Sequence, residues 1–571
     1  MAILKAITAG LLPLVGAVPA SPLASRAEAD VVEVILPSGT IIGSVGETVD
    51  TFNGIPYADA PVGDLRFRPP VKLSRDLGNF NATKKPLSCP QGPLVTLKGV
   101  SSVADIAGAA TIFNSTTGDD EAPASSEDCL TINVQRPNGV QAGDGLPVLF
   151  WIYGGGFLGG STAGFDGTKL IDTGVSLNQP FIFVAVNYRV AAWGFMPGRE
   201  ILEEGSGNAG LLDQRMGLEW VADNIEAFGG DPDKVTIWGE SAGAISVFDQ
   251  LVLFNGDATY NGKPLFRGAI MNSGSATPTD PLDSDKGQAI YDAIVEEAGC
   301  EGDDSLTCLR ELDNDQFTVA ANSVPGIFSY SSLALSFLPR PDGRVLTDSP
   351  DVLQRTERFH RVPMIIGTQE DEGTLFALTQ KNMSTTEQIV DYLAEFYFHD
   401  ADTDQITGLV DTYSSDPRDG SPYGVGGIWD IYPGQGRLAS MLGDIVFNLI
   451  RRISLQTFAD IAFEVPTWSY FSSYKYHPIL GVFGTYHGSD IGVLFSDDND
   501  KYPTITGRTY YINFLYNLDP NEGASVDVFW PEWKDENKLL NFKATENVLK
   551  DDDYRNASST YLIDHIDYLR F

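Results

Sequence analysis

The chain has 571 residues, of which 43% are hydrophobic and 20% charged, values typical of a globular protein with a large core rather than a disordered chain. Lys and Arg number 38 against 77 Asp and Glu, and the net charge of −39 argues against nucleic acid or an acidic membrane as a partner. No Pro/Ser/Gly-rich linker or run of like charge divides the interior, so we expect one domain over residues 21–571.

The first twenty residues have the pattern of a secretory signal peptide. Lys5 precedes an apolar stretch over residues 6–18, and small residues follow up to Ala20. We expect cleavage after Ala20, with Ala24 and Ala29 as alternatives. The stretch is too short to span a bilayer, and no second apolar run of spanning length follows, so we expect a secreted, extracellular protein without a transmembrane segment.

Short apolar runs alternate with helical patterns along the chain. The runs predict strands buried on both faces of a sheet, at residues 146–153, 181–188, 234–239 and 362–367. Helical spacing covers residues 211–228, between the second and third runs, and residues 242 to about 254, directly after the third. This alternation predicts an α/β fold with a largely parallel central sheet.

Cysteine usage fits an oxidising compartment. Four cysteines allow three pairings, and nested or crossed pairings would need longer-range closure than sequential ones. We therefore expect the disulfides Cys89–Cys129 and Cys300–Cys308. Four Asn-X-Ser/Thr triplets add candidate glycosylation sites, at Asn81, Asn114, Asn382 and Asn556.

The sequence Gly-Glu-Ser-Ala-Gly, centred on Ser241, is the strongest chemical signal. A predicted strand leads into it and a predicted helix leads out, which is the context of a nucleophile held on a sharp strand-to-helix turn. Such a turn crowds the positions two residues before and after the serine, and glycine fills both here. The pattern predicts that Ser241 is a nucleophile whose hydroxyl lies above the carboxyl edge of the sheet, with a helix N-terminus behind it to favour negative charge.

Three glycines, residues 154–156, follow the first buried run and precede Phe157. Acyl transfer generates an oxyanion, and backbone N–H groups stabilise it only where no side chain blocks their approach. We expect the amides of Gly155, Gly156 and Ala242 to form this oxyanion hole.

A serine hydroxyl needs a base, and imidazole has a suitable pKa. Of the five histidines, His487 lies in a turn flanked by glycine, whereas His360, His399, His477 and His565 fit surface or packing positions. A carboxylate must then orient the imidazole. Three acidic residues follow the fourth apolar run, and the pattern does not separate Glu370, Asp371 and Glu372.

Many further motifs occur in one order along the mature chain. They are FNGIPY (52–57), PVGDLR (61–66), EDCLTIN (127–133), GGGF (154–157), NYR (187–189), NAGL (208–211) with DQ (213–214), FGGDP (228–232), GESAG (239–243), LPRPDG (338–343), DEGT (371–374) and His487. Together they resemble the type-B, cholinesterase-like carboxylesterase/lipase family of α/β hydrolases, and within it the secreted fungal lipases and sterol esterases of the Candida rugosa and Geotrichum type.

This resemblance implies a Ser-His-Glu triad of Ser241, His487 and Glu372, with oxyanion donors Gly155, Gly156 and Ala242. The two expected disulfides also match the pairing in the family that the chain resembles. One departure is Tyr153, which precedes the glycine loop where many family members carry histidine; the fungal lipase branch accepts an aromatic residue there. The resemblance therefore implies a competent serine ester hydrolase that cleaves lipid esters through an acyl-enzyme.

The Cys89–Cys129 loop carries apolar residues three or four apart, as on one face of an amphipathic helix, at Leu97, Val100, Val103, Ile106, Ala110 and Phe113. In the lipases that the chain resembles, this loop is a lid over the active site. A surface helix packed permanently on the core is the alternative.

Other functions and ligands have weaker support. The segment 205–210 fits G-x-G-x-x-G, but no strand pattern precedes it, and no P-loop, H-E-x-x-H or C-x-x-C is present, so we expect neither cofactor nor metal. The sequence does not rank three candidate substrate classes, namely triacylglycerols, steryl esters and small soluble esters. A non-catalytic binding protein is the rival class, although every triad position is filled. No motif sets an oligomeric state.

Overall fold

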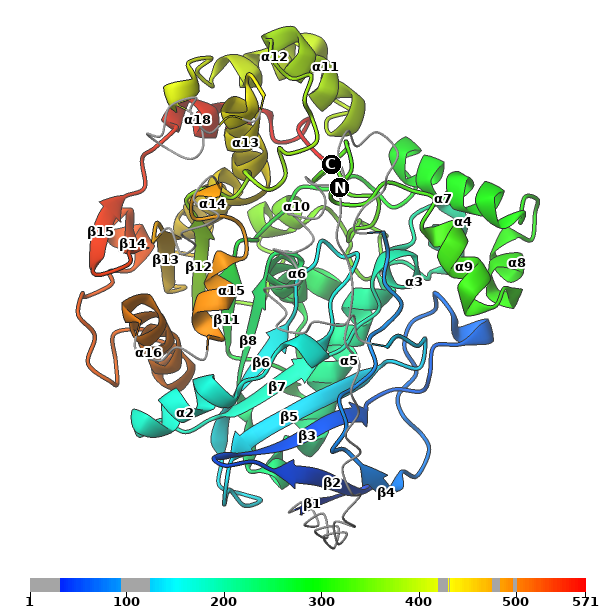
Figure 1. Cartoon of the computed structure of the whole chain (residues 1–571), viewed down its shortest axis with the longest axis vertical. Coiled ribbons are helices and arrows are strands. Elements are labelled where there is room, and N and C mark those ends of the chain that lie inside the picture. Colours follow the sequence, from blue (N-terminus) through cyan, green and yellow to red (C-terminus); the bar gives the residue numbers. More distant parts are fainter. Residues whose placement is uncertain (1–30, 94–123, 420–429, 431, 475–482, 497–500) are drawn as a thin grey trace, which may run out of the picture.

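The computed structural model describes residues 31–93, 124–419, 430, 432–474, 483–496 and 501–571 (Figure 1). The expected signal peptide (1–20), the apolar stretch of the expected lid (97–113), Asn114 and His477 lie outside the described residues. The strands are β1 (Val31–Leu36), β2 (Gly39–Val45), β3 (Val49–Pro56), β4 (Gly78–Asn81), β5 (Thr131–Pro137), β6 (Leu146–Ile152), β7 (Ile182–Val186), β8 (Gly230–Glu240), β9 (Thr259–Tyr260), β10 (Lys263–Pro264), β11 (Gly268–Asn272), β12 (Met364–Gln369), β13 (Thr467–Ser472), β14 (Lys538–Phe542) and β15 (Asn547–Asp551).

Within the described residues, a 13-stranded sheet forms the centre of the molecule, with the order β1-β2-β3-β5-β7-β6-β8-β11-β12-β13-β14-β15 and with β4 beside β2. Every neighbouring pair from β7 to β14 in this order is parallel, whereas the pairs from β1 to β7 and the last pair are antiparallel; β4 lies parallel to β2. The four predicted strands are β6, β7, β8 and β12, all in the parallel part. The α/β fold with a mostly parallel sheet is therefore confirmed.

The main helices are α2 (Thr168–Ser176), α3 (Ala191–Phe195), α4 (Arg199–Glu204), α5 (Ala209–Asn224), α6 (Ala242–Gly256), α7 (Asp285–Ala298), α8 (Ser305–Glu311), α9 (Asn314–Ala321), α10 (Pro350–Arg355), α11 (Thr386–Phe396), α12 (Thr403–Asp411), α13 (Gln435–Gly443), α14 (Leu449–Ile461), α15 (Ser489–Leu494), α16 (Tyr502–Asn517), α17 (Trp533–Glu536) and α18 (Asn556–His565). The two helices predicted from sequence are α5 and α6. The last turn of α6 departs from helical geometry at residues 253–255, close to the predicted end.

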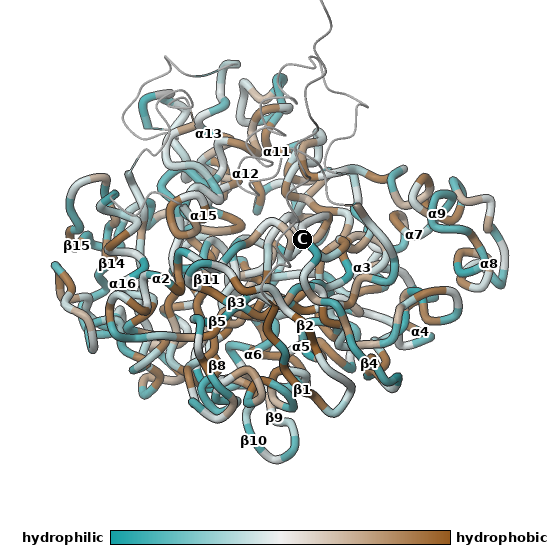
Figure 2. The backbone as a smooth tube through the Cα atoms, turned by 60° about the horizontal axis from the view of Figure 1, so that its bottom comes forward, coloured by the Kyte–Doolittle hydropathy of each residue, from teal (hydrophilic) through white to brown (hydrophobic). Residues whose placement is uncertain are grey.

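Helices cover both faces of the sheet. Successive side chains of a strand point to opposite faces of the sheet. The contacts of the neighbours Phe150 and Trp151 of β6 therefore identify the helices on each face. Phe150 lies against α5, where a Cβ on Gly217 would come within 3.4 Å of its ring. Trp151 packs instead on Phe495, at the end of α15, with ring centroids 5.2 Å apart. Figure 2 shows hydrophobic stretches along the central strands and hydrophilic stretches in the outer loops.

The carboxyl ends of the central parallel strands lie side by side, and this edge carries the candidate site. In the register of the sheet, Ile152 of β6 pairs with Gly239 of β8, and Glu240 pairs with Asn272 of β11. The chain leaves each strand here, so the segments after β6, β8, β11 and β12 meet at one edge. Ligands of open α/β sheets bind at this edge.

Both expected disulfides are present. Cys89 pairs with Cys129 and Cys300 with Cys308, with Cα atoms 5.0 and 5.6 Å apart. The first bond closes the loop in which the lid is expected; the lid itself remains a prediction. In the described part of the chain, none of the helices combines the length and apolar character that crossing a membrane requires.

Candidate active site

Ser241 occupies a strained turn between β8 and α6. Its backbone has φ 57° and ψ −125°, a conformation that L-residues rarely adopt. The flanking glycines are required sterically: a Cβ on Gly239 would lie 2.3 Å from Gly243, and a Cβ on Gly243 would lie 2.1 Å from the carbonyl oxygen of Ile152. Glycine therefore allows the turn to pack directly on β6 and to lift the serine above the sheet edge.

The structure brings Ser241, His487 and Glu372 together. The His487 Nε2 atom lies 2.8 Å from Ser241 Oγ, and its Nδ1 atom lies 2.6 Å from Glu372 Oε2. All three residues are buried. A serine, an imidazole and a carboxylate in this order and at hydrogen-bond distance form the geometry of nucleophile, base and orienting acid.

The sequence pattern did not decide which of Glu370, Asp371 and Glu372 orients the imidazole, and the three residues have different positions in the structure. Glu372 contacts the imidazole, whereas Asp371 accepts a hydrogen bond from the Thr485 backbone N–H at 2.9 Å. The Asp371 N–H in turn donates to the Thr485 carbonyl at 3.0 Å. Asp371 therefore connects the segment after β12 to the segment that carries His487. Glu370, directly after β12, is only partly buried.

The second oxygen of Glu372 is also fixed. Its Oε1 atom accepts hydrogen bonds from Ser273 Oγ at 2.6 Å and from the Gln369 backbone N–H at 2.7 Å. Ser273 follows β11, and no sequence pattern marked it as part of the site. These donors hold the carboxylate in one orientation, so that the Nδ1–H of His487 has a defined acceptor.

Two opposing effects act on the imidazole. Burial lowers the pKa of His487, but the charge of Glu372 and its hydrogen bond raise it, and the net pKa is above the ordinary value of 6.5. The ring contacts Phe447 and Phe376, with centroid distances of 4.4 and 5.1 Å. Phe447 belongs to a π-helical segment, Asp444–Asn448, between α13 and α14. Such segments are frequent at functional sites.

Glu240 is a further acidic group that the sequence reasoning did not single out. Its Oε1 atom lies 3.4 Å from His487 Nε2 and has no hydrogen-bond partner among the described residues. Burial raises the pKa of Glu240 to about 8, against the lowering effect of His487. Burial similarly raises the pKa of the nearby Asp490 to about 6. Glu240 reaches the imidazole only through a tertiary contact, whereas Asp490 lies three residues after His487 in the sequence.

The glycine loop packs directly against the turn that carries Ser241. A Cβ on Gly154 would lie 2.5 Å from the Glu240 carbonyl oxygen. Gly155 has φ 121°, and a Cβ there would lie 2.3 Å from the Gly159 carbonyl oxygen. Within the described part of the chain, the amides of Gly155, Gly156 and Ala242 have no acceptor, so all three remain available to a ligand.

Tyr153, which precedes the glycine loop where many family members carry histidine, is a buried structural residue. Its hydroxyl donates to the Tyr188 carbonyl at 2.9 Å, and the two rings stack with centroids 4.4 Å apart. Its side chain therefore fixes the start of the glycine loop.

An apolar pocket opens from Ser241. Gly156, Ser241 and Ala242 line one part of it, and the remaining wall is mostly hydrophobic, with Phe157, Ile245, Ile327, Leu333, Val446 and Phe447. An apolar cavity with few polar groups is typical of a site for a hydrocarbon-rich ligand.

The remaining candidate residues lie elsewhere. His360, His399 and His565 each bond a backbone carbonyl of a nearby segment, which agrees with packing or surface roles. Asn81, Asn382 and Asn556 are exposed, and their glycosylation remains a prediction. The G-x-G-x-x-G segment at 205–210 follows helix α4 rather than a strand, as expected.

The comparisons with known proteins agree with this site. The sequence pattern of the carboxylesterase family matches residues 30–561. The chain is 54% identical to a secreted triacylglycerol lipase of Gibberella zeae, over 95% of this chain and 92% of the relative. It is 49% identical to secreted lipase 1 of Botryotinia fuckeliana, over 97% and 96%. The crystal structure of EstA from Aspergillus niger superposes with a TM-score of 0.77 and 26% identity, over 94% of this chain and 99% of that one.

The chain therefore belongs to the carboxylesterase family, with the α/β-hydrolase fold, and is a carboxylic ester hydrolase. Its resemblance to secreted fungal lipases is confirmed. Both of these relatives are named as secreted, which agrees with the expected secretion of this chain.

Proposed function

We propose that this protein is a lipase that hydrolyses esters of long-chain fatty acids, triacylglycerols among them, with Ser241 as its nucleophile. One observation carries the proposal: the hydrogen-bonded series Glu372–His487–Ser241 ends at a mainly apolar pocket. The name of the Gibberella zeae relative supports the choice of triacylglycerols.

The chemistry follows from the geometry. His487 Nε2 accepts the proton of Ser241 as its oxygen attacks the ester carbonyl, while Glu372 holds Nδ1–H and stabilises the imidazolium. The open amides of Gly155, Gly156 and Ala242 stabilise the oxyanion, supported by the N-terminus of α6. His487 then protonates the leaving alcohol, and water hydrolyses the acyl-enzyme by the same steps in reverse.

The pocket favours a long acyl chain over a short one, because burying each methylene contributes about 0.8 kcal/mol. This argument does not depend on the alcohol part of the ester, so glycerides and steryl esters compete as substrates. Rates on triolein, cholesteryl oleate and p-nitrophenyl butyrate at equal enzyme concentration rank the three classes. We expect triolein hydrolysis to exceed that of cholesteryl oleate; a rate confined to the short ester would contradict the proposal.

Ser241→Ala tests the nucleophile. We expect loss of p-nitrophenyl butyrate hydrolysis without a change in thermal unfolding temperature, because the removed hydroxyl contributes only one hydrogen bond. Ser176→Ala, at an exposed serine at the end of α2, is the matched control and should retain full activity. Near wild-type turnover in Ser241→Ala would refute the assignment.

A further inference from the structure

One face of helix α6 runs along the pocket. Ser241, Ile245 and Asp249 are spaced four residues apart, so they lie on the same side of the helix, and all three line the pocket. Eight residues of helix rise span about 12 Å. Asp249 therefore lies about two turns from the nucleophile, where the middle of a bound acyl chain would be.

Asp249 is an unusual residue for such a place. Its carboxyl group is fully buried, and neither oxygen has a hydrogen-bond partner among the described residues. Burial raises the pKa of Asp249 well above its ordinary value, which favours the protonated carboxyl group, and that form can both donate and accept a hydrogen bond. A buried polar group without a partner costs stability and calls for a ligand or another explanation.

Thr279 adds a second polar atom to the same pocket. Its hydroxyl is also buried without a partner in the described part of the chain. Thr277 lines the pocket too, but its hydroxyl already donates to the Ser275 carbonyl. Asp249 and Thr279 thus supply three unpartnered oxygen atoms to a wall that is otherwise mainly apolar.

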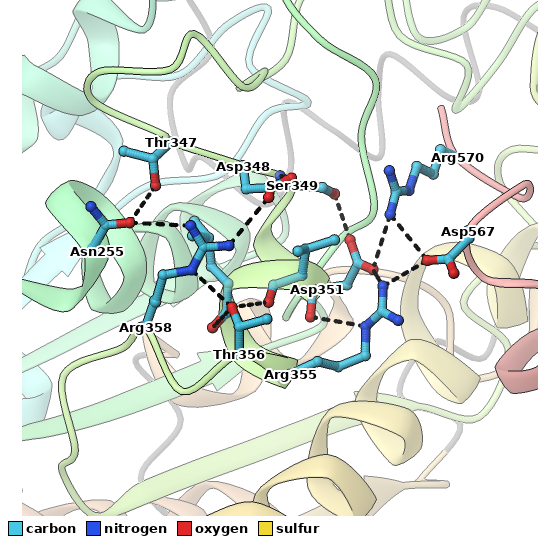
Figure 3. Close-up of polar contacts among 12 residues, drawn as sticks. Asn255, Thr347, Asp348, Ser349, Asp351, Arg355, Thr356, Arg358, Asp567 and Arg570 are labelled. Atoms are coloured by element: carbon cyan, nitrogen blue, oxygen red, sulfur yellow. Dashed lines mark hydrogen bonds and ion pairs between the residues drawn. The ribbon is translucent and has the colours of Figure 1, made fainter.

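A polar network behind the wall fixes Thr279. Its backbone N–H donates to Ser349 Oγ at 3.0 Å, and Ser349 Oγ donates to Asp351 Oδ1 at 2.5 Å. Asp351 is held in turn by Arg355 of α10 at 2.9 Å and by Arg570 at 3.7 Å (Figure 3). Because the network joins α10 to the C-terminal segment, it anchors the backbone of Thr279.

We propose that Asp249 and Thr279 form a polar subsite for a hydroxyl group in the middle of the acyl chain, which makes this enzyme selective for esters of mid-chain hydroxylated fatty acids. The inference rests on the proposed function. An extended chain advances about 1.2 Å per single bond, so a span of about 12 Å places the hydroxyl near the tenth carbon.

An unsubstituted chain would fill the same pocket but leave the Asp249 and Thr279 oxygens unpaired. A hydroxylated chain pairs them, and a site built to bond a hydroxyl discriminates against the analogue that lacks it. One hydrogen bond to a buried neutral group corresponds to a preference of about tenfold in kcat/KM.

The test compares p-nitrophenyl esters of stearic, 10-hydroxystearic and 3-hydroxystearic acid, dispersed in the same detergent. The 3-hydroxy ester controls for polarity, because its hydroxyl lies near Ser241 and out of reach of Asp249. We expect the wild-type enzyme to prefer only the 10-hydroxy ester over stearate, by about tenfold. A ratio near 1, as when water satisfies Asp249, would overturn the inference.

Variants identify the residues responsible. In Asp249→Leu, the 10-hydroxystearate rate should fall and the stearate rate should rise until their ratio is near 1, with an unchanged or higher unfolding temperature because an unpaired polar group is removed. Asp249→Asn should keep part of the preference, and Thr279→Val should reduce it. A preference that survives in Asp249→Leu refutes the subsite. If stearate is cleaved at Ser241 without any preference, the inference fails while the proposed function stands.

Discussion

Replacing Glu372 by glutamine tests the role of the acid with an almost isosteric change. The carboxylate receives three donors, namely His487 Nδ1 on one oxygen and Ser273 Oγ with the Gln369 N–H on the other. A glutamine side chain has only one acceptor oxygen. Because the backbone N–H of Gln369 cannot reverse its direction, we expect the amide oxygen to stay on that side and the NH2 group to face His487.

This orientation gives the wrong histidine tautomer. Nδ1 must then accept a hydrogen bond, so the proton of the neutral ring moves to Nε2, which faces Ser241 and can no longer take its proton. The same defect in a serine protease triad lowers kcat by about 10⁴, which corresponds to about 5 kcal/mol. We expect a loss of this order in Glu372→Gln, measured as kcat for p-nitrophenyl butyrate.

Ser273→Ala serves as the control for this prediction. It removes one donor to the carboxylate but keeps the charge and the tautomer, so its activity should fall by no more than about tenfold. Thermal unfolding of both variants separates catalysis from folding. Retention of more than about a tenth of the activity in Glu372→Gln would show that the tautomer argument is wrong.

Three further predictions concern pH, packing and stability. Since catalysis needs a neutral imidazole and Glu372 helps to raise the pKa of His487, kcat/KM should rise with pH through an apparent pKa above 6.5; a lower value would contradict this assignment. Gly243→Ala places a Cβ 2.1 Å from the Ile152 carbonyl oxygen and should lower both activity and the free energy of unfolding, the latter by about 1–3 kcal/mol; full activity would argue against the tight turn. Asp552 forms buried ion pairs with Arg451 at 2.7 Å and Arg452 at 2.9 Å, so Asp552→Ala leaves both arginines without their carboxylate and should cost about 3–5 kcal/mol in urea unfolding; a loss below about 1 kcal/mol would be inconsistent with these buried ion pairs.

Four strands of the parallel part, β6, β7, β8 and β12, were predicted because they are buried on both faces and therefore read as continuous apolar runs. The strands β11, β13 and β14 of the same part were not predicted. The strands from β1 to β5 were not predicted. Glu33 interrupts the apolar residues of β1, glycine and polar residues flank the two isoleucines of β2, and β4 has one apolar residue, so none of these strands forms a long continuous apolar run. The π-helical segment Asp444–Asn448 likewise has no local sequence signal.

In the candidate site too, the residues with a local sequence signal were predicted and those brought in by tertiary contacts were not. Ser241 and the glycine loop were predictable because a local turn requires glycine at fixed positions, and the resemblance to a family pointed to Glu372 and His487. Ser273 and Glu240 were not predicted as parts of the site. Ser273 meets Glu372 across 99 residues of sequence, a contact that only the folded sheet edge creates.

Covalent labelling by a fluorophosphonate tests the central claim most directly, and it separates an enzyme from a non-catalytic binding protein. The account predicts one label per chain, located by peptide mapping on Ser241, with loss of esterase activity in proportion to labelling and no label in Ser241→Ala. Hydrolysis that persists in the fully labelled enzyme, or a label on another residue at full inactivation, would contradict it.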